Sequence, residues 1–134
     1  MSPSQLSHLG SDQCLKLLAS CRVGRVGTSI GALPVILPVN YVVLDNGVLF
    51  RTAAGTKLDA AVRGLVVAFE ADAYDPDGRA GWSVLLVGKA SEVSDPVELE
   101  RDEAIAMSPW PGAEGQLHYV HIKAERISGR RFGP

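Results

Sequence analysis

Six runs of apolar residues, rich in Val, Leu and Ile, follow one another along the chain and are separated by Gly, Pro, Asn and Asp. They cover Val23–Ile30, Leu33–Leu44, Val48–Thr52, Leu65–Ala71, Trp82–Val93 and Leu117–Ile127. Short β-branched and aliphatic runs bounded by turn residues are typical of β-strands. The pattern predicts a mainly β protein with flanking helices, in which closing an antiparallel sheet into a barrel removes exposed strand edges.

Two of these runs carry further detail. The segment Val84-Leu85-Leu86-Val87 is apolar without alternation, which predicts a strand buried on both faces. The runs Val39–Leu44 and Val48–Phe50 are joined by Asp45-Asn46-Gly47, a combination that favours a tight hairpin turn. Arg51 and Thr52 are therefore expected at the end of a strand.

Three stretches have the start signals of helices. Ser11 is placed to cap an amphipathic helix ending near Arg22, and Thr56 is followed by Asp59 at capping-box spacing. The third, Asp95-Pro96-Val97-Glu98, predicts a helix that runs to about Met107.

The chain has 134 residues, 46% of them apolar, and a formal net charge of −2. We expect a loose lead-in over residues 1–10 and a single domain over 11–134. The charge balance argues against a nucleic-acid or membrane-surface binder. No apolar run approaches the roughly 20 residues that span a bilayer, and residues 1–10 lack the pattern of a secretory signal. A cytoplasmic location is expected.

The cysteines and histidines of the sequence do not form a common catalytic or metal-binding motif. Cys14 and Cys21 lie seven residues apart on one expected helix, about 10 Å along its axis, which is too far for a disulfide. Both are interpreted as packing residues. His118 and His121 are three apart in an expected strand and so point to opposite faces, and no metal site is expected.

A cationic segment follows the hairpin. Arg51, Thr52, Gly55, Thr56 and Lys57 bring a guanidinium, an ammonium and two hydroxyls to the start of an expected helix. Unpaired N–H groups and partial positive charge at a helix start suit a phosphate. The alternative interpretation is a capped helix with two solvated cations.

The order and spacing of several motifs resemble the FMN-binding split-barrel family related to pyridoxamine phosphate oxidase, in particular its short bacterial members, which include nitroimidazole-resistance-like proteins. The resemblance covers roughly residues 11–132. Its motifs are Cys21–Val26, Leu37–Val42, Phe50–Thr52 with Gly55–Leu58, Gly81–Val84, Gly88–Ala90 and Val120–Phe132.

The resemblance implies a six-stranded antiparallel split β-barrel that forms a two-fold homodimer, with FMN in the cleft between the subunits. It assigns the phosphate to Arg51, Thr52, Thr56 and Lys57. The isoalloxazine edge is assigned to Pro38, Val39, Asn40 and Tyr41, largely through their backbone groups, and the ring or ribityl chain to Trp82 and Ser83. Trp110, Arg130 and Arg131 are further candidates for residues supplied by the second subunit.

The function implied is a flavin-dependent oxidoreductase acting on a small molecule whose identity the sequence does not give. The tail lacks the Arg-x-His element of true pyridoxamine phosphate oxidases, so vitamin B6 oxidation is not expected. Two alternatives stay open: an F420-dependent oxidoreductase of the same fold, and a non-catalytic dimer that binds a cofactor or haem. No catalytic acid or base is identified.

Overall fold

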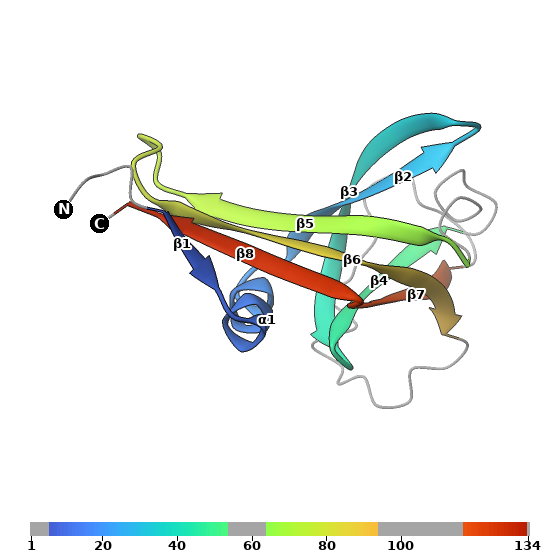
Figure 1. Cartoon of the computed structure of the whole chain (residues 1–134). Helices are drawn as coiled ribbons and strands as arrows, with labels where there is room; N and C mark the ends of the chain where they lie inside the picture. Colours follow the sequence, from blue (N-terminus) through green and yellow to red (C-terminus); the bar gives the residue numbers. More distant parts are fainter. Residues whose placement is uncertain (1–5, 54–63, 94–116, 134) are drawn as a thin grey trace.

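A computed structural model describes residues 6–53, 64–93 and 117–133 of the chain. This part contains one helix and eight strands (Figure 1). The elements are β1 (Leu6–Leu9), α1 (Ser11–Ala19), β2 (Val23–Ile30), β3 (Leu33–Leu44), β4 (Gly47–Ala53), β5 (Val66–Tyr74), β6 (Gly81–Val93), β7 (Leu117–Lys123) and β8 (Arg126–Phe132).

Strands β2 to β7 close into a barrel. The sheet order is β1-β8-β6-β5-β2-β3-β4-β7, and an additional pairing between β6 and β7 joins the two ends of the six-stranded part. Every pairing is antiparallel. Strands β8 and β1 extend the sheet beyond β6 and lie outside the closed barrel. The chain therefore has the six-stranded antiparallel split barrel that its sequence predicts.

Strand β6 belongs to both parts because it changes partner along one edge. Its residues 81–87 pair with β8, and its residues 90–93 pair with β7. Gly88 lies at the change, where a Cβ atom would stand 1.8 Å from the carbonyl oxygen of Lys123. Only glycine permits so close a backbone approach, so this residue allows the barrel to close.

The apolar side chains inside the barrel continue under α1, which packs against β8, β3 and β6. Tyr41 joins the two parts. Its ring meets the edge of Phe69 with centroids 4.7 Å apart, and its buried hydroxyl donates to the carbonyl of Leu18 in α1. Its backbone N–H donates to the carbonyl of Arg22 at 3.0 Å. One residue thus fixes the helix on the barrel.

The elements at the two ends differ from the sequence expectations. Helix α1 begins at Ser11 with Gly10 as its cap, because the side chain of Gln13 accepts a hydrogen bond from the N–H of Gly10 at 3.3 Å. It ends at Ala19, before Arg22, and Cys21 lies beyond it; both cysteines are free.

Two segments contain more strand structure than the sequence indicates. Leu6–Leu9, assigned to the lead-in, form β1 on the edge of β8. The single strand expected over Leu117–Ile127 is two strands, which separate at Ala124 and Glu125 as the chain moves from β7 to β8. The helices predicted after Thr56 and after Asp95 lie outside the described residues.

The prediction that the central part of β6 is buried on both faces is wrong for a single chain. Val84 and Leu86 are fully buried, but Leu85 is 45% exposed. Leu85 pairs with Glu70 and Ser128, and its side chain lies on the side of the sheet opposite the core. The structure thus leaves an apolar strand face without cover from the described elements.

We predict that Tyr41→Phe lowers the free energy of unfolding by about 1–3 kcal/mol, because it removes a buried hydrogen bond and leaves the Leu18 carbonyl without that donor. Thermal or urea unfolding measures this loss. Tyr74→Phe, at a tyrosine that is 68% exposed, is the matched control and should be neutral. Equal stability of the two variants would contradict the anchoring role of Tyr41.

Candidate functional site

The cation of Arg51 is held at the end of β4. Its guanidinium lies over the ring of Tyr119, 5.8 Å from the ring centroid, within the range of a cation–π contact. Arg51 is half-buried, and it pairs in register with Tyr119 on β7. An arginine positioned in this way presents a planar set of N–H donors suited to a phosphate.

Thr52 points the other way. Neighbouring residues of a strand face opposite sides, and the Thr52 side chain is the one polar side chain among the described residues that is fully buried, at 3% exposure. It pairs in register with His118 on β7. Nδ1 of His118 lies 4.0 Å from Oε1 of Glu92 on β6. A hydroxyl, an imidazole and a carboxylate therefore lie at one end of the barrel, where Thr52 is buried and the Glu92 side chain is 41% exposed. Sequence reasoning did not connect His118 and Glu92 with Thr52.

The four residues of β3 that the resemblance assigns to the flavin ring alternate between the two faces of the strand. Val39 and Tyr41 are buried in the core, whereas Pro38 is exposed and Asn40 half-exposed on the outer side. Val39 and Tyr41 can therefore reach a ligand only through their backbones. Tyr41 pairs with Phe50 on β4, so Asn40 and Arg51 each lie one residue beyond that pair on neighbouring strands. Asn40 and Arg51 thus follow the last pair of these two strands, at the point where β3 passes from β4 to β2.

Trp82 and Ser83 lie far from this cluster within one chain. Tyr119 on β7 pairs with Arg51 on one side and with Val93 of β6 on the other. Ser83 precedes Val93 by ten residues, which corresponds to roughly 30 Å along a strand. Trp82 packs against the core, and Ser83 points to the outer side. A single chain therefore does not assemble the full set of expected residues. Thr56, Lys57 and Trp110 lie outside the described residues.

A second cluster, which the sequence reasoning missed, lies on the outer side beside β3. Nη1 of Arg25 on β2 is 3.0 Å from Oε1 of Glu70 and 3.8 Å from Oδ1 of Asp72, both on β5. Arg25 also pairs in register with Pro38. The signal in the sequence is Phe69-Glu70-Ala71-Asp72, in which two carboxylates alternate with core residues and must share the other face.

The pKa of Glu70 is raised to about 7. Burial is the largest cause, followed by the hydrogen bond with Asp72 and the negative charge of Asp72; Arg25 opposes the shift. The Glu70 carboxyl therefore changes between its protonated and ionised forms near neutral pH.

The part of the chain that the structure describes contains no group of three His, Cys, Asp or Glu side chains arranged to hold a metal ion. None of its helices is long and apolar enough to cross a membrane.

Residues 10–131 match the family model of pyridoxamine 5'-phosphate oxidase, and the chain belongs to this family. It is 44% identical over 136 residues to the uncharacterized protein Rv0080 of Mycobacterium tuberculosis, across 98% of this chain and 88% of that protein. The FAD binding protein from Mycobacterium smegmatis is 35% identical, with a TM-score of 0.75 over 96% of this chain and 99% of that one.

The chain also has the fold of a nitroimidazole-resistance-like protein. A candidate 5-nitroimidazole antibiotic resistance protein from Bacteroides thetaiotaomicron has a TM-score of 0.72 over 96% of this chain and 90% of that one. At 12% identity this similarity concerns the fold alone. The resemblance seen in the sequence is confirmed.

We predict that Glu70 makes stability depend on pH. Its pKa is higher in the folded chain than its ordinary value of 4.5, so its contribution is fully present below about pH 4.5 and is lost as the pH rises through about 7. The melting temperature of the wild type should fall across this window, and Glu70→Gln, which stays neutral, should flatten the fall. Identical profiles for the two proteins would contradict the shifted pKa.

Proposed function

We propose that the chain is a flavin-binding oxidoreductase that holds the flavin phosphate beside Arg51. The observation that carries the proposal is the Arg51 guanidinium, which is fixed over the Tyr119 ring at the end of β4. A relative named FAD binding protein that is 35% identical over nearly the whole chain supports it. Family membership alone gives the fold and the class, since one fold supports many functions.

The residues fit a phosphorylated, planar ligand. The Arg51 guanidinium offsets the phosphate charge, and the sequence adds Thr56 and Lys57 as further donors. The Thr52 hydroxyl is buried on the opposite face of β4 and is not among them. Pro38 and Asn40 present side chains along the outer side of β3, where Val39 and Tyr41 offer backbone alone. When bound, a flavin supplies hydride or electron transfer at its N5 atom, and the protein contributes orientation and electrostatics.

The family resemblance implies FMN, while relatives are named for FAD. The phosphate attached to the ribityl chain is common to both, and it is the group that Arg51 would bind. We therefore propose FMN as the ligand and make FAD an outcome of the test. The F420 and haem alternatives have no support from the described side chains beyond this shared anion site.

The test is an absorption titration of the purified protein with FMN, FAD, F420 and haem in separate arms. We expect a flavin spectrum that shifts on binding and saturates with FMN, and bleaching when a nicotinamide donor is added. Saturation with FAD alone would reassign the nucleotide. Binding without reduction by any donor would favour a cofactor-binding protein, and an unchanged spectrum in every arm would overturn the proposal.

We predict that Arg51→Ala weakens FMN binding by about 1.5–3 kcal/mol, roughly ten- to hundredfold in Kd, because it removes a charge-assisted contact. Arg79→Ala removes an equally charged but highly exposed guanidinium, which pairs with Asp77 at 3.5 Å, and should leave Kd unchanged. Equal Kd values for these variants would show that the phosphate lies elsewhere.

A further inference from the structure

The side of the sheet opposite the core carries a group of three charged side chains next to β3. Nη1 of Arg25 lies 3.0 Å from Oε1 of Glu70 and 3.8 Å from Oδ1 of Asp72. We call these three residues the carboxylate–arginine cluster. Their side chains are 48%, 33% and 28% exposed, respectively, so water screens their charges only in part.

The two carboxyl groups of the cluster are also hydrogen-bonded to each other. An ionised carboxylate only accepts hydrogen bonds, so one of the two groups must carry a proton when this bond forms. Two carboxylates this close resist ionising together. The pKa of Glu70, which burial and Asp72 raise to about 7, agrees with a proton held on Glu70.

The strand register places the cluster beside two residues that the family resemblance assigns to the flavin ring. Arg25 on β2 pairs with Pro38 on one side and with Glu70 on the other. Residues paired across strands share a face, with Cβ atoms about 4.5–5.5 Å apart, and Asn40 lies on that face two residues beyond Pro38. The Glu70 carboxyl is thus two strand spacings from β3, roughly 10 Å, with the guanidinium between them.

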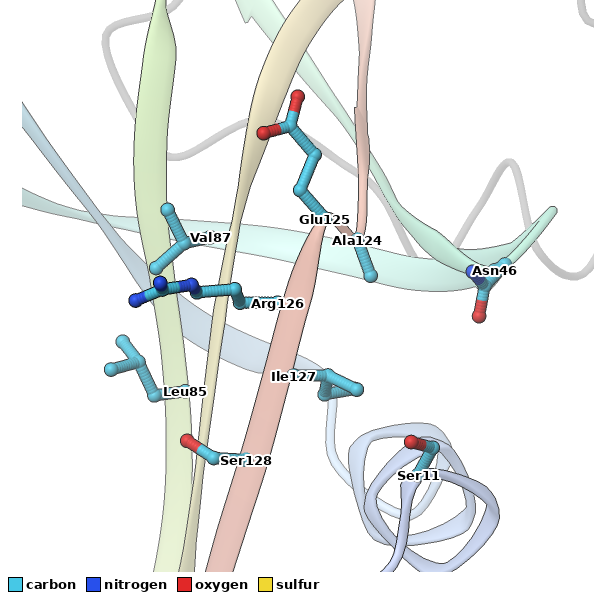
Figure 2. A pocket seen from close by; sticks show the side chains of 9 residues that line it. All are labelled: Ser11, Asn46, Leu85, Val87, Ala124, Glu125, Arg126, Ile127 and Ser128. Atoms are coloured by element: carbon cyan, nitrogen blue, oxygen red, sulfur yellow. The ribbon is translucent and has the colours of Figure 1, made fainter.

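Few other charges lie on this side of the sheet near the carboxyl pair. Strand β6 contributes Leu85 and Ser83, and neither side chain is charged. Figure 2 shows Arg126 pointing to the same side as Leu85, but Arg126 belongs to β8, on the far side of β6. Within the described residues, the charged neighbours of Glu70 on β2 and β5 are therefore Arg25 and Asp72.

The net charge of the cluster depends on one proton. With Glu70 protonated, the charge of Arg25 balances that of Asp72, and the cluster is neutral. With Glu70 ionised, the cluster carries one negative charge. A unit charge roughly 10 Å away in a partly screened environment changes an equilibrium that involves charge by about fivefold. The cluster can therefore alter the electrostatics next to Pro38 without any movement of the backbone.

We propose that Glu70 is a positioning residue for the flavin ring: through Arg25, its protonation sets the charge beside Pro38 and Asn40, and so the preference of the site for reduced over oxidised flavin. This inference rests on the proposed function. Charge close to the ring tunes the electronics of a flavin. Protonated Glu70 leaves the Arg25 guanidinium available to stabilise the electron density that reduction adds, and ionised Glu70 offsets that guanidinium.

The test is the reduction potential of the bound flavin, measured against a reference dye from pH 5.5 to pH 8.5. The wild type is compared with Glu70→Gln, whose side chain stays neutral at every pH. We expect equal potentials at pH 5.5. At pH 8.5 the preference of the wild type for reduced flavin should be about fivefold lower than that of the variant, or about 20 mV for a two-electron couple. Titration of the flavin itself is common to both proteins and cancels in the difference.

The outcomes separate this inference from the proposed function. A protein that binds no flavin at pH 5.5 would refute the proposed function, and this inference with it. Flavin that binds with the same potential in both proteins across the whole range would refute the inference alone. A difference that is constant with pH would also overturn it, because it would reflect a change of structure rather than of charge.

Asp72→Asn tests the same proton if Glu70→Gln does not fold. Asp72 raises the pKa of Glu70 through both its hydrogen bond and its charge, so this variant should move the change in potential to lower pH. A change that stays at the pH of the wild type would contradict the proposal.

Asp77→Asn is the matched control. It removes a carboxylate from the β5–β6 turn that is 59% exposed and lies 3.5 Å from Arg79. Its potentials should equal those of the wild type at every pH. If Asp77→Asn changed the potential as Glu70→Gln does, the effect would belong to the net charge of the chain, and the role of the cluster would be overturned.

Discussion

The change of partner along one edge of β6 determines both the shape of this protein and the division of its site. Near Gly88 the strand leaves β8 and pairs with β7. The backbone of Lys123 approaches Gly88 too closely for any side chain, so this change of partner requires glycine there. This pairing closes the barrel and fills its interior with Val84, Leu86 and Ala90. The same closure leaves the other face of β6 outside, where no described element covers it.

The site follows from this division. Asn40 and Arg51 each lie one residue beyond the Tyr41–Phe50 pair because β3 and β4 form a tight hairpin. The cation–π contact with Tyr119 fixes the guanidinium at the end of β4. Ser83 lies at the other end of β6 and points away from the core. A homodimer with the ligand between its subunits, which the family resemblance implies, would account for both the separated residues and the uncovered apolar strand.

The sequence predicts the strands well where apolar residues and turn residues alternate clearly, as between β2 and β4. It predicts the ends less well. Gly10 rather than Ser11 caps the helix because Gln13 bonds back to it, and β1 carries too few residues to give a periodic signal before β8 is known to lie beside it. The position of Arg51 at the end of a strand can be predicted from the neighbouring residues alone. The pairing of Arg25 with Glu70 joins residues 45 positions apart, and His118 meets Glu92 through strand pairing, so neither contact has a local signature.

The most direct test of the shared site is complementation between two variants that bind flavin poorly for different reasons. Arg51→Ala removes the phosphate contact of a chain's own site. Ser83→Trp obstructs the site of the partner subunit if the ligand lies between two subunits, as the family resemblance implies. A heterodimer of the two retains one site in which both chains are native, so a mixture of the variants should recover flavin absorption that neither binds alone. If the mixture bound no more flavin than the sum of the separate variants, the two-chain site would be contradicted.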